Sequence, residues 1–537
     1  MIDFDHKPWL SHYDKGIPNE IDIPKLTLVD LLDQAVEKFG HSPCIVEENR
    51  IWTYEQIGAY SNTIARFFID RGIKKGDRVG ILLPNTPEFV ITYYGILKAG
   101  GVVMAMNPAH KPTEVKTQAM ESGIGILFLP SEKLVEIYRI QNSTQIDTLV
   151  VINGTNKSIG AENIKWEELL NQFKTGSIDK RYISPEDPAV FQFSGGTTGV
   201  SKCAIGLHQN LVANVCQFQH RLVNTEVGKE TVLVAIPMYH VYGMVLGMNL
   251  AVKMGARMVL IPDPRDLDRL LSSIQKFKVT VFPGVPNIYA AINRYPDVLA
   301  GRYDLSSIKA CISGSATLSP HIKQAFESLT NGHLVEGYGL SEAPTATHCN
   351  PILGENRTGS IGLPLPNVDC RVVDIETGAK QLGIDDEGEL ILRGPQVMAG
   401  YHSRPDETKL ALRNGWLFTG DVVRMDQDGY FYLVDRKKDV IKVGGFQVWP
   451  NEIEKVIEQH PKVKEAAVAG IQDQDGNEAA KAWVVLHEGE TAEAEEIQKF
   501  CQIELTQYKI PRFIEFRESL PRTTVGKVLR RVLAEEG

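Results

Sequence analysis

The sequence has few cysteines, and none of them form a close pair. Seven cysteines are scattered singly over 537 residues, without a C-x-x-C pair. Structural zinc sites and disulfide frameworks both depend on clustered or evenly paired cysteines. The scattered pattern therefore gives no support for a zinc site, and it predicts a reduced, cytoplasmic location.

Long hydrophobic runs and a secretory leader are also lacking. The N-terminal residues MIDFDHKPWLSHYDKG have no basic start followed by an apolar core, which a signal peptide requires. The most apolar stretch, VYGMVLGMNLAV, ends at Lys253 and is shorter than the roughly 20 residues that span a bilayer. A peripheral membrane contact and a homodimer both stay open.

Positive charge is in deficit. The chain has 57 Lys and Arg against 67 Asp and Glu, for a net charge of -10. Surfaces that bind nucleic acid are usually basic. We therefore expect no nucleic-acid partner.

A standard phosphate loop is missing as well, although one stretch resembles it in composition. Residues 193–203 read FSGGTTGVSKC. The Walker pattern requires Lys directly after its last Gly, whereas Lys202 comes three residues after Gly199. Gly526-Lys527 also fails the pattern, because Pro521 stands where the first Gly belongs. An ordinary Walker-type NTPase site is excluded.

What is present is a repeated alternation of strands and helices. The first helix is expected over TLVDLLDQAVEKF, with Thr27 as its cap. RVGILLPN, GVVMAMNP and GILFLP then read as strands separated by helices, and the same texture returns in TVLVAIP, RMVLIPD and VTVFPGV. The chain is also too long for one hydrophobic core. We predict an α/β fold with two parallel-type sheets covered by helices.

The texture changes in the last third of the chain. Asp369 to about Tyr432 contains short strands joined by Gly- and Asp-rich turns, which predicts an antiparallel β-barrel or small sheet. A charged run, DRKKD, precedes a separate α+β pattern of about 100 residues. We therefore predict a large domain over 1–435 and a small mobile domain over 436–537.

The glycine-rich stretch has the chemistry of an anion site. Glycines permit positive φ and a close backbone approach, and consecutive N–H groups form an anion-binding nest. Ser194, Thr197 and Thr198 add hydroxyl donors, and Lys202 adds a positive charge. By itself, such a turn is more often an ordinary surface loop.

Three further stretches carry polar groups in loops. In EGYGLSEAP, Tyr338 could stack on a planar base, Ser341 could donate to a phosphate, and Glu342 could share a magnesium ion with it. Asp421 follows a Thr-Gly turn, where its carboxylate could accept hydrogen bonds from a ribose.

The last two candidates are basic residues. Arg436 could pair with a phosphate or a ribose oxygen, and Lys527 follows Gly526 near the chain end. Taken singly, the tail would read as a disordered basic segment.

Together, in this order, the four stretches resemble the adenylate-forming superfamily of acyl-CoA synthetases, adenylation domains and luciferases. The nearest resemblance is to fatty acid–CoA ligases, and it extends from the first helix to Lys527. It implies an enzyme of fatty acid metabolism that activates a carboxylic acid with ATP as acyl-AMP and transfers it to CoA, with Mg²⁺ as cofactor. The implied nucleotide-binding residues are Ser194, Gly195, Gly196, Thr197, Thr198, Gly199, Lys202, Gly314, Ser315, Ala316, Gly337, Tyr338, Gly339, Ser341, Asp421, Arg436 and Lys527.

The resemblance also implies catalytic, metal and CoA-binding residues. Lys527 would bridge the carboxylate and the phosphate, and Glu342 with Ser194 would bind the metal. The superfamily alternates between two orientations of its small domain, and the matching hinge is Lys438. The second orientation would present Lys442, Gly444 and Gly445 to CoA.

IPMYHVYGM resembles the acyl-site motif of the superfamily. His240 is implied to orient the carboxylate, against the alternative of a structural histidine. Tyr239, Tyr242 and Met244 are expected to shape an apolar pocket. An aryl-CoA ligase and a ligase that loads a separate carrier protein are the alternative functions.

Overall fold

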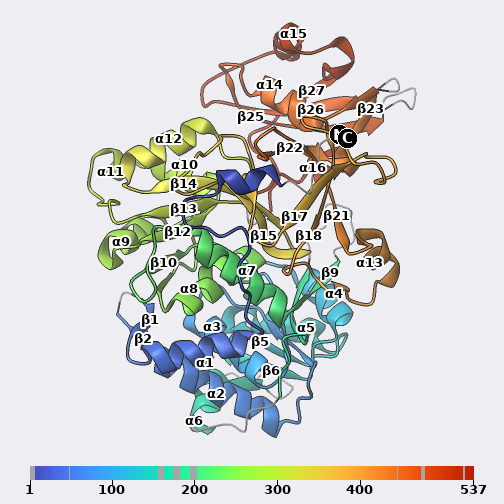
Figure 1. The fold of residues 1–537 in the computed structure, drawn as a ribbon. Helices are drawn as coiled ribbons and strands as arrows, with labels where there is room; N and C mark the ends of the chain where they lie inside the picture. The colour runs from blue at the N-terminus through green and yellow to red at the C-terminus, as the bar shows by residue number, and fades with distance from the viewer. Residues whose placement is uncertain are drawn as a thin grey trace.

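A computed structural model describes residues 7–47, 49–154, 163–172, 182–193, 202–443, 446–472, 478–523 and 526–536. It confirms the predicted α/β class, with two large sheets that contain parallel strands (Figure 1). The eight-stranded sheet has the order β19-β9-β8-β4-β3-β5-β6-β7. Its strands are β19 (Gly400–Tyr401), β9 (Cys203–Leu207), β8 (Pro188–Phe193), β4 (Val102–Ala105), β3 (Arg78–Ile81), β5 (Ile126–Pro130), β6 (Thr148–Ile152) and β7 (Asn163–Lys165).

The second large sheet has nine strands, in the order β16-β15-β14-β13-β12-β10-β11-β1-β2. Its centre is parallel, while β2, β15 and β16 pair antiparallel with their neighbours. The strands are β16 (Leu363–Pro364), β15 (Ala343–Cys349), β14 (His333–Leu340), β13 (Ala310–Ser313), β12 (Val281–Gly284), β10 (Thr231–Val234), β11 (Arg257–Leu260), β1 (Pro43–Val46) and β2 (Ile51–Thr53).

Helices pack on these sheets because their apolar residues recur on one face. The first helix, α1, begins after Thr27, whose hydroxyl accepts from the Asp30 N–H in a capping box. The helices of this part are α1 (Leu28–Phe39), α2 (Tyr54–Asp70), α3 (Pro87–Lys98), α4 (Pro112–Ser122), α5 (Leu134–Gln141), α6 (Trp166–Gln172), α7 (His208–Arg221), α8 (Leu250–Met254), α9 (Leu267–Phe277), α10 (Pro286–Asn293), α11 (Pro296–Leu299) and α12 (Pro320–Leu329), together with the π-helix η4 (Gly243–Asn249). Of the helices described, none is both long and apolar enough to cross a membrane.

The region after Asp369 forms the expected antiparallel structure. It is a five-stranded sheet in the order β17-β18-β21-β20, with β22 paired to β21. These strands are β17 (Asp369–Val373), β18 (Gly388–Arg393), β20 (Leu412–Arg413), β21 (Trp416–Met425) and β22 (Phe431–Arg436). The helix α13 (Pro405–Ala411) directly precedes β20 in the chain.

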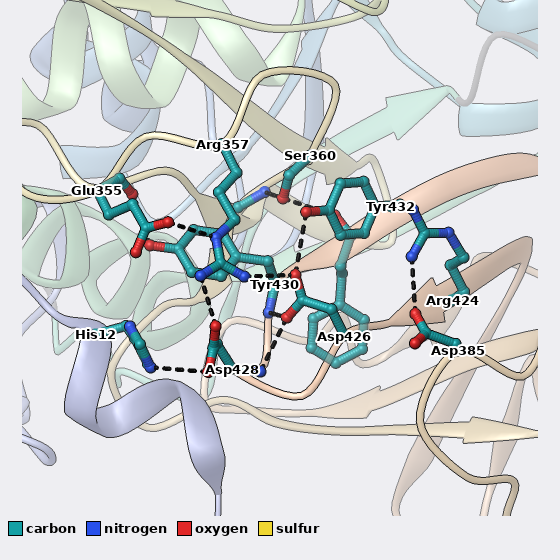
Figure 2. A network of polar contacts seen from close by, with 12 residues as sticks. His12, Glu355, Arg357, Ser360, Asp385, Arg424, Asp426, Asp428, Tyr430 and Tyr432 are labelled. Carbon is teal, nitrogen blue, oxygen red and sulfur yellow. Dashed lines mark hydrogen bonds and ion pairs between the residues drawn. The ribbon is translucent and has the colours of Figure 1, made fainter.

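A polar network fixes the turn of the β21–β22 hairpin (Figure 2). Arg357 donates to Asp426 at 2.7 Å and to Asp428 at 2.6 Å, and the Tyr432 hydroxyl donates to Asp426 at 3.0 Å. His12, from the N-terminal segment, lies 3.5 Å from Asp428. With its turn held in this way, the hairpin presents its open end to the C-terminal elements.

The C-terminal elements form the orange and red part at the top of Figure 1. They have apolar cores of their own, built around residues such as Ile453, Val468 and Trp483. The elements are η5 (Lys437–Asp439), β23 (Ile441–Val443), β24 (Phe446–Val448), α14 (Pro450–Ile457), β25 (Val463–Gln472), β26 (Glu478–Leu486), α15 (Ala494–Glu504), β27 (Phe513–Phe516) and α16 (Arg530–Glu535).

Candidate active site

A cleft of about 1000 Å³ lies where the large sheets, the β21–β22 hairpin and the C-terminal elements meet. Residues that are hundreds of positions apart in sequence line it. Of the candidate residues, the lining includes Lys202, Tyr239, His240, Tyr242, Gly314, Ser315, Gly337, Tyr338, Gly339, Ser341, Glu342, Asp421, Arg436, Lys438 and Lys527. Ala316 lines the adjoining cavity. These residues of the predicted set therefore converge on one place, whereas the described residues Met244 and Lys442 do not line the cleft.

The open end of the hairpin holds a buried carboxylate. Asp421 on β21 is the cross-strand partner of Arg436 on β22, and Arg436 Nε lies 3.0 Å from Asp421 Oδ1. The Tyr338 hydroxyl donates to Asp421 Oδ2 at 2.5 Å. Burial and the adjacent Asp421 carboxylate raise the pKa of Tyr338 well above its usual range. Tyr338 is therefore a protonated donor, and Asp421, which is only 3% exposed, presents acceptor oxygens.

Glu342 stands in the turn between β14 and β15. The Tyr401 hydroxyl donates to Glu342 Oε1 at 2.7 Å, and the Glu342 carbonyl accepts from the Met398 N–H at 2.9 Å. Lys202 Nζ lies 5.1 Å from the centre of the Tyr401 ring. Because β19 pairs with β9, the register of these two strands brings Tyr401 between Lys202 and Glu342.

The glycine-rich loop itself lies outside the described residues. This applies to Ser194, Gly195, Gly196, Thr197, Thr198 and Gly199. Within the described part of the chain, no group of three or more His, Cys, Asp or Glu residues could hold a metal ion. Glu342 is one of the carboxylates that line the cleft, together with Asp421, Glu114, Glu389 and Glu407.

Gly339 shows why the turn around Glu342 needs glycine. A Cβ at Gly339 would lie 1.7 Å from the Thr345 carbonyl oxygen, which no side chain can tolerate. The close backbone approach of β14 to β15 therefore depends on the missing side chain.

Lys527 lines the cleft, and its backbone forms two hydrogen bonds with Thr523, four residues earlier in the chain. The Thr523 N–H donates to the Lys527 carbonyl at 2.7 Å, and the Lys527 N–H donates to Thr523 Oγ1 at 3.1 Å. Desolvation, followed by the positive charge of Arg436, lowers the pKa of Lys527 to about 8. The cleft therefore holds an amine that is mostly protonated at neutral pH and is poised to lose its proton above it.

Lys442 lies elsewhere. It is exposed on β23, where it pairs with Gln447, and it is not among the residues that line the cleft. Gly444 and Gly445 fall outside the described residues. The structure thus presents Lys527, and not Lys442, to the cleft.

The apolar side of the cleft is built on aromatic residues from the IPMYHVYGM segment. The Tyr242 hydroxyl donates to the carbonyls of Ile312 at 2.6 Å and Gly284 at 3.1 Å, which fixes the ring against the sheet. A Cβ at Gly314 would lie 3.1 Å from that ring. Glycine at this position thus allows the ring to form a close wall.

His240 belongs to the same wall. Burial lowers the pKa of His240 to about 4, so the ring is neutral at neutral pH. The Tyr242 N–H donates to His240 Nδ1 at 3.2 Å, which assigns the proton to Nε2. A neutral imidazole with Nε2–H is a hydrogen-bond donor.

Met244 differs from expectation. It is 0% exposed within the π-helix η4 and is not one of the cleft-lining residues. Leu246 of the same helix and Phe218 of α7 line the cleft instead. Met244 was expected from the resemblance of IPMYHVYGM to the acyl-site motif, and its burial within the π-helix keeps it out of the cleft lining.

The two parts of the chain match two related family models. Residues 32–402 match the model described as AMP-binding enzyme, and residues 452–527 match the AMP-binding enzyme C-terminal domain. The chain belongs to the AMP-binding enzyme family.

Two relatives that match this AMP-binding enzyme over nearly its full length carry the same name. This chain is 39% identical to a long-chain-fatty-acid–CoA ligase of Bacillus subtilis (strain 168), with 99% of this chain and 98% of the relative covered. It is 35% identical to a ligase of the same name from Escherichia coli O157:H7, with the same coverage.

Solved structures of similar proteins share its fold. An anthranilate CoA ligase in complex with anthranoyl-AMP matches with a TM-score of 0.85 at 26% identity, over 96% of this chain and 98% of that chain. ATP-bound MatB from Rhodopseudomonas palustris matches with a TM-score of 0.85 at 28% identity, over 95% and 99%.

Several residues of the AMP-binding enzyme's cleft were not found from sequence. Tyr401 lies in AGYHSRP, where no motif marks it. Phe218 and Leu246 look like ordinary core residues of amphipathic segments. Only the pairing of distant elements reveals that these side chains meet the cleft.

Proposed function

We propose that this AMP-binding enzyme is an ATP-dependent acid–CoA ligase that acts on a medium- or long-chain fatty acid. The observation that supports this best is the meeting of Lys527, Asp421 and Glu342 in one cleft that also has an apolar wall. A positive charge, a ribose acceptor and a carboxylate for a phosphate-bound metal are the groups that acyl adenylation requires. The names of the full-length relatives support the same activity.

The proposed reaction has two steps. The acid's carboxylate oxygen attacks the α-phosphorus of ATP, and the bond to the β-phosphate breaks, which gives acyl-AMP and pyrophosphate. The CoA thiol then loses its proton and attacks the acyl carbon, and AMP leaves. In the first step two anions must approach each other, so the Lys527 ammonium lowers the barrier by neutralising the charge between them.

The nucleotide is proposed to lie along the hairpin and the β14–β15 turn. Asp421 accepts hydrogen bonds from the ribose hydroxyls and is held for this purpose by Tyr338 and Arg436. Ser315 and Ala316 border the base, and Ser341 approaches the α-phosphate. Lys202 and the glycine-rich loop take the β- and γ-phosphates.

Magnesium is proposed to arrive with ATP. A carboxylate beside the space proposed for the phosphates fits Mg²⁺, which usually combines one or two carboxylates with substrate phosphates and waters. Glu342 supplies that carboxylate, and Tyr401 orients it. The ion would neutralise phosphate charge, and Ser194 would add an oxygen.

The acid is proposed to lie against the aromatic wall. Neutral His240 donates from Nε2–H to the carboxylate. Tyr239 and Tyr242 flank the head of the acid, while Phe218 and Leu246 contact its tail. These side chains present apolar surface, which suits an aliphatic chain.

The small domain is proposed to begin at Arg436 and to swing about Lys438. In the orientation described, Lys527 faces the cleft. The second orientation would bring exposed Lys442 and the Gly444-Gly445 backbone to the thiol entry for CoA. Lys438→Pro should retain adenylation and impair thioester formation, because a fixed φ hinders rotation; equal rates in both half-reactions would contradict the hinge.

The substrate test is a panel of acids from C2 to C18, with benzoate and coumarate, scored by pyrophosphate release with CoA present. Fatty acids of C8 or longer should give the highest kcat/KM. Preference for the aromatic acids would indicate an aryl-CoA ligase instead, and turnover only with an acylated carrier protein as product would indicate a carrier-loading ligase.

The catalytic test uses Lys527→Ala. Carboxylate-dependent ATP–pyrophosphate exchange should be lost, while CoA still consumes a supplied acyl-adenylate. Unchanged exchange would contradict the role of Lys527.

A further inference from the structure

Arg530 lies three residues after Lys527 and is bound on several sides. We infer that Arg530 is a positioning residue, which acts through Lys527 by fixing the Lys527 loop against the nucleotide-binding hairpin. This rests on the proposed adenylation role of Lys527. The proposal depends on the contacts of a single guanidinium group with three separate elements.

The first set of contacts is with α14. Arg530 Nε donates to Glu454 Oε1 at 2.9 Å, and Arg530 Nη2 donates to Glu454 Oε2 at 2.6 Å. Arg530 Nη2 also donates to Asn451 Oδ1. This two-pronged pairing fixes the plane of the guanidinium, because both carboxylate oxygens are engaged at once.

The second set crosses to the end of β22. Arg530 Nη1 donates to Asp435 Oδ1 at 3.0 Å and lies 3.5 Å from Asp439 Oδ2 on η5. Asp435 is only 1% exposed, and its other oxygen accepts from the Asn451 N–H at 2.7 Å. A carboxylate so deeply buried needs a cationic partner.

Asp435 Oδ1 is shared with the next residue along the chain. It accepts from the Arg436 N–H at 2.8 Å, and the Arg436 side chain pairs with Asp421. One continuous chain of contacts therefore joins the Lys527 loop, through Arg530, to the carboxylate proposed to hold the ribose. This chain sets the position of Lys527 relative to the nucleotide.

Two further contacts hold the described residues between Gly526 and Arg530. Gly526 has φ +85°, and a Cβ there would lie 3.1 Å from Asn287 Nδ2 on α10. The Leu529 N–H donates to the Pro521 carbonyl at 2.8 Å. Gly526 therefore lies close to Asn287 of α10, and Arg530 holds the other end of this segment.

Lysine could not make the same contacts. The guanidinium of Arg530 reaches Asp435 and Glu454 simultaneously with three nitrogens, whereas an ammonium is a single point charge. The neighbouring Arg531 provides a contrast, because its side chain is 45% exposed and its one ion pair among the described residues is with Glu535, at 3.0 Å, one turn along α16. Arg531 is therefore a matched control of the same type.

The first experiment compares Arg530→Met with Arg531→Met in the full-length enzyme. Adenylation is measured by carboxylate-dependent ATP–pyrophosphate exchange, and folding is checked by CoA-dependent consumption of a supplied acyl-adenylate. Arg530→Met should slow exchange on the order of 100-fold, as expected for a misplaced catalytic group. Arg531→Met should stay within about twofold of the wild type. Equal rates in the two variants would overturn the inference.

The second experiment separates positioning from a general loss of structure. If Arg530 acts through Lys527, adding Arg530→Met should lower the residual exchange of Lys527→Ala, measured at high enzyme concentration, by no more than about twofold, because the two changes remove the same contribution. A further large loss in the double variant would show that Arg530 acts independently, and would overturn the proposal.

The pH profile provides a third readout. Arg436, Asp421, Asp439 and Arg530 are the charged groups that face Lys527, and the positive charge of Arg530 contributes to its lowered pKa. The exchange rate should fall at alkaline pH as Lys527 loses its proton, near pH 8 in the wild type. In Arg530→Met this alkaline fall of the exchange rate should therefore move above pH 8. An unchanged alkaline fall, with only a lower rate, would indicate a merely structural role and reject the inference.

Arg530→Lys decides the matter if the Met variant does not fold. It keeps one positive charge, so the alkaline fall should stay near pH 8, but exchange should be about tenfold slower because the two-pronged contact is lost. A wild-type rate in Arg530→Lys would refute the proposal. If Lys527→Ala itself exchanges normally, the proposed role of Lys527 fails first; if Lys527→Ala is inactive and the Arg530 variants are normal, only the present inference fails.

Discussion

Lys527 makes adenylation sensitive to pH in a specific direction. Burial and the charge of Arg436 lower its pKa from 10.5 to about 8. The ammonium form is the one that can neutralise two approaching anions. The adenylation rate should therefore be nearly full at pH 7 and below, and should be lost as the pH rises through the pKa of about 8.

The expected size of the effect follows from the protonated fraction. With a pKa of about 8, the ammonium fraction falls about tenfold between pH 7 and pH 9. The value of kcat/KM for ATP reports the free enzyme and should show this tenfold loss. The kcat profile should bend at higher pH, because bound triphosphate stabilises the ammonium form of Lys527.

The assay is carboxylate-dependent ATP–pyrophosphate exchange at limiting ATP, from pH 6.5 to pH 9.5. Lys527→Arg is the informative variant, since a guanidinium stays charged throughout this range; the variant should be slower but should show no alkaline fall.

Lys438 needs a control, because burial also lowers its pKa to about 8. Lys438→Met should retain the wild-type pH profile. The reasoning is refuted if Lys527→Arg keeps the alkaline fall, or if the wild type shows none between pH 7 and pH 9.

Three further predictions concern single contacts in the cleft. Tyr401→Phe removes a 2.7 Å hydrogen bond to the Glu342 carboxylate; kcat/KM for ATP should fall roughly tenfold, or about 1.4 kcal/mol, with little change in melting temperature. Gly339→Ala places a Cβ 1.7 Å from the Thr345 carbonyl; a urea melt should show a loss of about 3 kcal/mol or more, and an unchanged midpoint would contradict the close approach. Asp421→Asn should raise the KM for ATP by about tenfold or more. The increase in KM should be smaller when 2′-deoxy-ATP replaces ATP, and an equal increase for both nucleotides would contradict a hydrogen bond from Asp421 to the ribose 2′-hydroxyl.

Much of the fold could be predicted from local sequence. The Thr27 cap and the apolar face of α1 predict a helix that the structure confirms, with a capping box at its start. The alternating strands and helices predict the parallel centres of both large sheets. These features are local, because capping and hydrophobic periodicity depend on residues within a few positions of one another.

Local sequence could not predict which of the sheets each strand joins. β1 and β2 precede the eight-stranded sheet in sequence but belong to the other sheet, where β1 pairs with β11 more than 200 residues later. The same limit applies to Met244, whose place in a π-helix turns it away from the cleft. Sequence patterns define a strand's faces, whereas its neighbours follow from the packing of the whole chain.

The sequence by itself determined the types of chemistry available: a glycine-rich anion loop, a carboxylate at the end of a strand and a lysine near the chain end. Only the tertiary structure decided that the Tyr338 hydroxyl would meet Asp421, 83 residues away, and that Arg530 would bind Asp435 across 95. The physical reason is that a hydrogen bond requires two groups to lie within about 3 Å. That proximity depends on strand register and domain packing, which no local pattern in the sequence specifies.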